Sequence, residues 1–107
     1  MTLTTTGGDI LYLYNGAALS MSDITLTGGD SGIATRSSGD LALTAVTVTG
    51  ATYNGVEFYG TGSDVTIVSS TLDGNGAHGF YVANPPVLGI DAFVDDLTVT
   101  DTSISGN

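Results

Sequence analysis

The chain has no cysteine and no tryptophan, and its single basic residue is Arg36. Without cysteine, neither a disulfide bond nor a thiolate metal site can form. Eleven acidic residues face that one base, so the formal net charge is -10 at pH 7. A surface of this charge repels phosphate backbones and anionic lipids. We therefore expect neither nucleic acid nor a membrane as a partner.

Long apolar runs and helical periodicity are also missing. No apolar run approaches the roughly 18 residues of a membrane span, and no charged-then-apolar leader is present. No window repeats apolar residues with the helical spacing, so we expect almost no helix. The 16 glycines and the many threonine and β-branched residues instead favour short strands joined by turns. The length of 107 residues predicts a single domain over residues 1–107.

One phrase recurs along the chain. "VTIVSSTLDGN" occupies 65–75 and "LTVTDTSISGN" occupies 97–107, while related copies start at Leu19 and Leu41. The spacings between the starts are 41−19 = 22, 65−41 = 24 and 97−65 = 32 residues. In each copy, alternation of apolar and polar residues is interrupted by two residues and then resumes. This pattern predicts two strands joined by a corner around a shared core. The predicted corners are Ser22-Asp23, Thr44-Ala45, Val68-Ser69 and Thr100-Asp101.

A third short strand fits each period, as "LYLY", "GIATR", "GVEFY" and "GFYVA". Three strands per period of about 22–24 residues predict an all-β parallel solenoid of about four coils, without a capping helix. An antiparallel sandwich has no reason to repeat the same phase along the chain. The solenoid predicts one buried column made of Leu19, Leu41, Val65 and Leu97.

The stretch "GTGSDVTIVSSTLDGNGAHGFYV" resembles the repeat of right-handed parallel β-helix proteins. That architecture occurs in pectate lyases, polygalacturonases, mannuronan C5-epimerases and surface adhesins. The family names its sheets PB1, PB2 and PB3, and "GVEFY", "VTIV" and "TLD" resemble them in that order. The resemblance implies a right-handed β-helix with four PB1, four PB2 and five PB3 strands. It also implies an extracellular or cell-surface protein.

The two ends of the chain both fall in predicted PB3 strands, with no sequence for a covering helix. We therefore expect a segment of a longer β-helix. Uncovered end coils expose strand edges and apolar side chains, which favours end-to-end self-association and, at its limit, a fibre.

Outward residues of PB1 gather four of the chain's five tyrosines, its only glutamate and its only arginine. They form two predicted rows, one of Tyr12, Ala34, Glu57 and Tyr81 and the other of Tyr14, Arg36, Tyr59 and Ala83. Aromatic faces with a few polar groups suit sugar rings, so we expect this strip to contact a polysaccharide or other glycan. In the resembling enzymes PB1 also binds substrate. Alternatively, these tyrosines are simply good strand residues, Arg36 and Glu57 form an exposed ion pair, and His78 is a turn residue. The candidate glycan-binding residues are Tyr12, Tyr14, Arg36, Glu57, Tyr59, His78 and Tyr81.

Catalytic groups are sparse. Glycosidic hydrolysis normally uses two carboxylates, and the PB1 strip offers one, Glu57. "AHG" at 77–79 only half matches the Gly-His-Gly of polygalacturonases, and the C5-epimerase motif is missing. We assign no catalytic residue and expect a non-catalytic scaffold or adhesion-type segment. The alternative is a fragment of a polysaccharide lyase or C5-epimerase-like domain, in which Arg36, His78 and a tyrosine would act on a uronic acid.

Repeated aspartates near the turns suggest a metal. Stacked carboxylates repel one another unless a cation lies between them, and Ca²⁺ binds carboxylates in irregular geometry. The candidate ligands are Asp9 and Asp30 on one edge, and Asp40, Asp64 and Asp96 before the PB2 strands. The alternative is that each aspartate caps turn amides, with no cofactor involved.

Outward threonines on PB3 suggest one more alternative. The predicted outward pairs form a nearly regular array, which resembles the ice-binding face of β-helical antifreeze proteins. Outward threonine is also an ordinary way to cover an exposed parallel sheet. The predicted pairs are Thr4/Thr6, Thr25/Thr27, Thr47/Thr49, Thr71/Asp73 and Ser103/Ser105.

Overall fold

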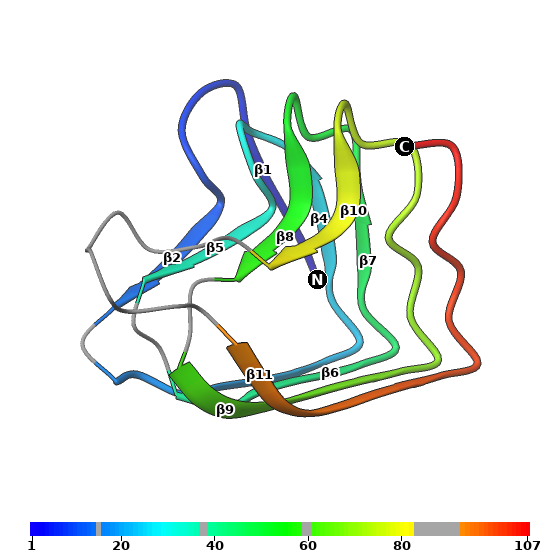
Figure 1. Ribbon diagram of the computed structural model, residues 1–107. Coiled ribbons are helices and arrows are strands. Elements are labelled where there is room, and N and C mark those ends of the chain that lie inside the picture. The colour runs from blue at the N-terminus through cyan, green and yellow to red at the C-terminus, as the bar shows by residue number, and fades with distance from the viewer. Residues whose placement is uncertain (15, 37–38, 59–60, 83–92) are drawn as a thin grey trace.

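The chain folds as a parallel β-solenoid (Figure 1). The structure is a computed structural model that describes residues 1–14, 16–36, 39–58, 61–82 and 93–107. Its strands lie in three sheets, and every strand pairing among the described residues is parallel. The all-β solenoid predicted from the repeat is therefore confirmed. No helix occurs in these ranges, and so none is long and apolar enough to cross a membrane.

Each sheet collects one strand from successive coils. PB1 consists of β2 (Leu11–Tyr14), β5 (Ile33–Arg36), β8 (Asn54–Phe58) and β10 (His78–Val82). PB2 consists of β3 (Leu19–Ser22), β6 (Leu41–Thr44), β9 (Thr61–Val68) and β11 (Phe93–Thr100). PB3 consists of β1 (Thr2–Thr5), β4 (Thr25–Gly28) and β7 (Thr47–Thr49).

The coil count and the PB3 sheet differ from the prediction. The chain makes about 3 turns rather than four. PB3 has three strands rather than five, and its later coils are joined only by isolated bridges at Thr71 and Ser103. Hydroxyl groups replace part of the ladder there: the Val46 amide donates to Ser70 Oγ at 3.1 Å, and the Ser70 amide to Thr102 Oγ1 at 3.3 Å. An amide bonded to a side chain does not extend a strand.

The core is a column of small aliphatic side chains between the three sheets. Fully buried members include Leu41, Val65, Ile67 and the aromatic ring of Phe58. Burying each such side chain contributes about 1.5–3 kcal/mol. The alternation read from the sequence therefore places the inward residues of the middle coils correctly.

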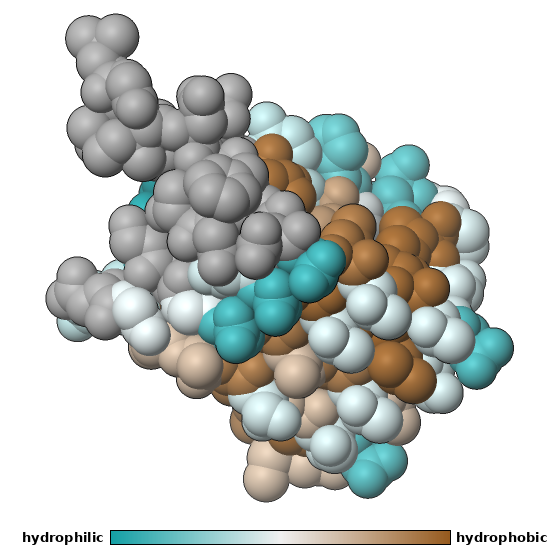
Figure 2. All heavy atoms as spheres, turned by 60° about the horizontal axis from the view of Figure 1, so that its bottom comes forward, coloured by the Kyte–Doolittle hydropathy of each residue, from teal (hydrophilic) through white to brown (hydrophobic). Residues whose placement is uncertain are grey.

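The predicted column is in register, but Leu97 is not buried, and Leu19 in the first coil is only partly buried. Leu19 pairs with Leu41, Leu41 with Val65, and Val65 with Leu97, as predicted. Yet Leu97 is 53% exposed, because the coil that carries it has a neighbouring coil on one side only. Figure 2 shows apolar patches interrupting the polar surface on the side where PB2 lies. The exposed apolar side chains of this last coil include Leu97, Val99 and Ile104.

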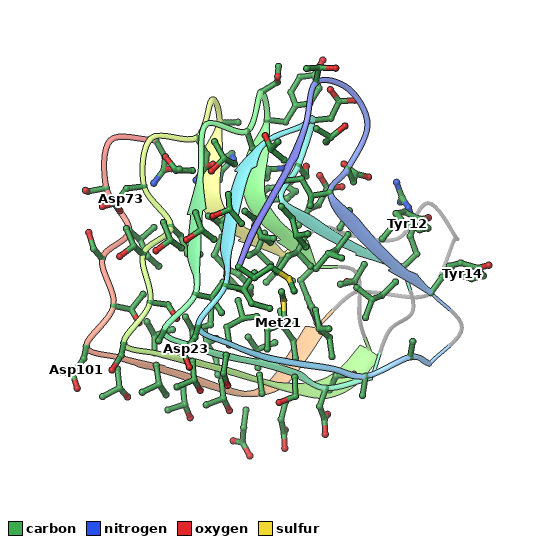
Figure 3. The ribbon with its side chains drawn as sticks, turned by 180° about the vertical axis from the view of Figure 1, so that it is seen from behind. Tyr12, Tyr14, Met21, Asp23, Asp73 and Asp101 are labelled. Atoms are coloured by element: carbon green, nitrogen blue, oxygen red, sulfur yellow. The ribbon has the colours of Figure 1, made fainter. Side chains whose placement is uncertain are left out.

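The PB2–PB3 corner has the same backbone conformation in every coil. Its second residue is left-handed in each case, with φ of 57° at Asp23, 54° at Ala45, 51° at Ser69 and 49° at Asp101. Corner amides donate to the next coil: Asp23 N to Thr44 O at 3.1 Å, and Ala45 N to Val68 O at 3.0 Å. Asp23 and Asp101 lie along this one edge in Figure 3. Left-handed backbone costs a non-glycine residue about 1–2 kcal/mol, so the stacked bonds hold the corner in place.

Two asparagines, the buried Asn75 and the exposed Asn107, join the coils at the PB3–PB1 turn. Asn75 is 3% exposed. Its Oδ1 accepts the Ala51 amide at 3.1 Å, and its Nδ2 donates to Val48 O at 3.2 Å. One coil further, Asn107 Oδ1 accepts the Asn75 amide at 2.9 Å. Each asparagine therefore satisfies backbone groups of the coil before it, which a buried turn requires.

Candidate functional site

The outward face of PB1 has the predicted rows. Tyr12 is paired with Ala34, Ala34 with Glu57, and Glu57 with Tyr81. In the second row Tyr14 is paired with Arg36. Neighbouring strands lie about 4.8 Å apart, so each row brings its side chains side by side. Tyr59, the remaining candidate of that row, lies outside the described residues.

Tyr12 and Tyr14 form an aromatic pair at one end of PB1. Tyr12 is 50% exposed and Tyr14 is 57% exposed. Their ring centroids are 5.8 Å apart, and the rings are tilted by 43°. Figure 3 shows both side chains pointing away from the core, on the side of β2 opposite to Met21. Two ring faces on one edge offer stacking surface to a flat ligand.

A second aromatic pair lies at the other end of the sheet. Tyr81 is 40% exposed, and its ring centroid lies 4.9 Å from that of His78. His78 is exposed and is the first residue of β10, so it is a strand residue rather than a turn residue. Its partner in the register is Asn54.

Between the two aromatic pairs, the outward face of PB1 carries no ring among the described residues, but one small side chain and two charged ones. Ala34 is only 7% exposed although it belongs to the outward row. Glu57 is half-buried beside it, and Arg36 is exposed in the other row. No pocket opens among the residues that the structure describes. The described part of this face is therefore an open surface rather than a pocket.

Asn54 is a member of this face that the sequence did not single out. Its Nδ2 donates to Glu57 Oε2 at 2.9 Å, and its Oδ1 lies 3.2 Å from His78 Nδ1. The signal that could have found it is the period. His78 follows Asn54 by 78−54 = 24 residues, which equals the spacing from Leu41 to Val65. Residues one period apart occupy the same place in adjacent coils.

Two of the aspartates predicted to bind metal are bonded to backbone amides. Asp9 Oδ1 accepts the Ser31 amide at 3.0 Å, and Asp40 Oδ1 accepts the Asp64 amide at 2.9 Å. Asp9 is level with Ser31 rather than with Asp30, because Leu11 is paired with Ile33 and 33−11 = 31−9.

Metal binding by these aspartates stays a prediction. Within the described ranges, no three histidine, aspartate or glutamate side chains gather closely enough to hold a metal ion. Asp64 and Asp96 lie inside the PB2 strands β9 and β11 rather than before them as predicted, because these strands begin earlier, at Thr61 and Phe93. The remaining candidate, Asp30, donates its amide to Gly8 O at 2.7 Å.

The pKa of Asp9 is raised above its ordinary value. Burial is the main cause, the negative charges of Glu57 and Asp30 add to it, and the Ser31 amide and Arg36 oppose it. A carboxyl whose pKa is higher in the folded state binds its proton more tightly there than in the unfolded chain. Its contribution therefore lowers stability as pH rises from the unfolded value through the raised folded value.

We expect Asp9→Asn to raise the melting temperature at pH 7. The amide keeps an oxygen that can accept the Ser31 amide hydrogen and removes the charge that burial disfavours. The gain should shrink as pH falls below the raised pKa of Asp9, where the native carboxyl is itself protonated. Thermal melts across pH measure this, with the exposed Asp64→Asn as control. A gain that is independent of pH would contradict the explanation.

On PB3 the predicted pairs Thr25/Thr27 and Thr47/Thr49 are in register, but the first predicted pair is wrong. Thr2 is paired with Thr25 and Thr4 with Thr27, so the first pair is Thr2/Thr4 rather than Thr4/Thr6. The inward Leu3, paired with Leu26, sets this register. One row continues from Thr47 through Thr71 to Ser103. In the other row Asp73 stands in place of threonine (Figure 3), and its carboxylate accepts Ser103 Oγ at 2.8 Å and the Ser105 amide at 2.7 Å. The Ser103 bond is the main cause that lowers the pKa of Asp73.

Comparison with known proteins gives one match. The family model for the right-handed beta helix region matches residues 2–107, which is nearly the whole chain. No curated protein matches the sequence. No solved structure matches it either.

Proposed function

This chain belongs to the right-handed β-helix family, and on that premise we propose that it is a non-catalytic scaffold whose PB1 face binds a glycan. The observation that carries the proposal is the exposure of Tyr12, Tyr14 and Tyr81 on one sheet. Large rings left half in water offer stacking surface to the apolar faces of sugars. Polar groups between the rings can bond to hydroxyls.

The spacing of the aromatic pairs indicates an extended ligand. Tyr12 on β2 and Tyr81 on β10 are separated by three strand spacings, which is about 14 Å. A single sugar ring cannot contact both. An oligosaccharide lying along the solenoid axis, across the strands, could stack on each end and pass over Ala34 and Glu57.

The charge of the molecule favours a neutral glycan over a polyuronate. The net charge is -10, and Arg36 is the only basic residue of the chain. On the PB1 face Glu57 adds a negative charge in the row between the two tyrosines. A polyuronate would be repelled at low salt, and the repulsion would weaken as the Debye length falls to about 8 Å at physiological ionic strength. This glycan contact also fits the extracellular or cell-surface setting that we propose.

We expect Tyr12→Ala and Tyr81→Ala each to weaken glycan binding by about tenfold, which is the effect of losing about 1.4 kcal/mol of ring contact. Both side chains are exposed, so the melting temperature should change little. A glycan array with neutral and uronic acid oligosaccharides identifies the ligand, and titration calorimetry then measures affinity.

Tyr53→Ala is the matched control. Tyr53 is 58% exposed, but it precedes β8 and stands outside the outward rows of PB1. Its loss should leave binding unchanged. Equal losses in all three variants would show that the contact is not specific to PB1. Absence of binding by the native chain to any oligosaccharide would refute the proposal and leave the scaffold role alone.

A further inference from the structure

Three polar side chains form a linked set beside Tyr81. Asn54 bridges Glu57 and His78, at 2.9 Å to Glu57 Oε2 and 3.2 Å to His78 Nδ1. Asn54 is 8% exposed, so its amide is held inside the turn rather than rotating in water. Glu57 and His78 come from adjacent strands, β8 and β10.

The chemistry of these groups fixes where each hydrogen lies. An ionised carboxylate can only accept, so the Asn54 group that faces Glu57 is its NH₂. The carbonyl oxygen of Asn54 then faces His78, and it too can only accept. His78 Nδ1 must therefore carry a hydrogen. In the neutral imidazole this leaves Nε2 unprotonated, with a lone pair available.

The ring of His78 is placed where a ligand of PB1 would lie. His78 is exposed, and its ring lies 4.9 Å from the ring of Tyr81. Because Nδ1 faces Asn54, Nε2 lies on the ring edge that points away from Asn54. A sugar stacked on Tyr81 would bring its hydroxyl groups to this edge. A hydroxyl donates well to an unprotonated imidazole nitrogen.

We propose that His78 Nε2 is the hydrogen-bond acceptor that recognises a glycan hydroxyl on PB1, and that Asn54 and Glu57 are positioning residues that hold its tautomer. The inference rests on the glycan-binding function proposed above and adds its recognition chemistry. It favours sugars with a free hydroxyl at the ring edge over oligosaccharides methylated there, which cannot donate.

The tautomer can be measured without any ligand. The chain has one histidine, so its imidazole ¹⁵N spectrum contains a single ring. At alkaline pH, where imidazole is neutral, we expect the native protein to show a protonated Nδ1 and an unprotonated Nε2. Asn54→Ala and Glu57→Ala should both shift the ring toward the other tautomer. Glu57 is half-buried on the outward face, so Glu57→Ala should fold even if Asn54→Ala does not.

Binding then tests the acceptor role. His78→Phe keeps an aromatic ring beside Tyr81 but removes both nitrogens, and we expect about tenfold weaker glycan binding. Glu57→Ala should weaken binding less, because it changes the tautomer population without removing the nitrogen. Methylation of the oligosaccharide hydroxyls should weaken binding to the native protein much more than binding to His78→Phe.

Each result counts for or against the inference. A native spectrum with a protonated Nε2 overturns it, as does undiminished binding by His78→Phe. In the second case, the proposed function stands if Tyr12→Ala still weakens binding. Absence of glycan binding by the native protein overturns the acceptor role together with the proposed function.

Discussion

Replacing Gly76 with alanine should lower the free energy of unfolding by about 2–4 kcal/mol. The new Cβ would meet the carbonyl oxygen of Thr52 and lie 2.8 Å from the carbonyl carbon of that residue. Both are backbone atoms of the preceding coil, so no side-chain rotation can relieve the overlap. The Gly76 amide also donates to Ala51 O at 2.8 Å, and moving the chain apart would weaken that bond.

Gly7→Ala is the control for this substitution. Gly7 lies in the corresponding PB3–PB1 turn of the first coil, but a Cβ added there has nothing within 4 Å. Its replacement should leave stability unchanged or raise it by up to about 1 kcal/mol, since alanine restricts the unfolded chain. Urea denaturation of both variants measures the difference. Similar stabilities for the two would show that the coils are not packed as closely as the structure has them.

Asn75→Asp should cost about 2–4 kcal/mol at pH 7. One carboxylate oxygen could still accept the Ala51 amide, but the other would face Val48 O, which also only accepts. Burial raises the pKa of such a carboxyl above its unfolded value. The protonated acid can donate to Val48 O, so the variant should regain stability as pH falls through that raised pKa.

Asn107→Asp is the matched comparison, because Asn107 occupies the same turn position one coil further and is exposed. Solvent screens the new charge there, and the expected loss is under about 1 kcal/mol. Unfolding in urea at several pH values checks both variants. Equal losses of stability, or a loss at Asn75 that does not depend on pH, would contradict the role assigned to the buried Asn75 side chain.

The strands and corners of each coil could be predicted from the sequence, because the alternation of apolar and polar residues involves residues that are close together in the chain. Alternation identified Leu41 and Val65 as inward, and both are buried. The interruption of that alternation marked each corner, where the second residue is left-handed. Burial of Leu97 could not be predicted from alternation, because burial also requires a coil on the other side.

The candidate site was predicted only in part. The row from Tyr12 to Tyr81 follows from the alternation of inward and outward side chains along each strand, and its residues are in register as expected. The link from Asn54 to Glu57 joins residues i and i+3, which lie on opposite faces of a regular strand. This hydrogen bond therefore depends on an irregular backbone at the start of β8, which simple alternation of side chains does not predict. The offset of Asp9 arises similarly: the first PB3–PB1 turn, Thr5 to Leu11, is longer by one residue than Gly28 to Ile33.

The unequal periods of the repeat show where this architecture can absorb changes in length. From the inward residue of PB1 to that of PB2 the chain advances 19−11 = 8, 41−33 = 8 and 65−56 = 9 residues, but 97−80 = 17 in the last coil. Val65 is nevertheless paired with Leu97, and Val56 with Phe80, on either side of this longer connection. The longer connection thus leaves β11 in regular register with β9 from Leu97 onward, after two register shifts between Phe93 and Leu97. Within a strand, one added residue would turn every following side chain to the opposite face. Evolution, or a protein engineer, could graft new segments at the PB1–PB2 corner of any coil, next to the aromatic face, without redesigning the core.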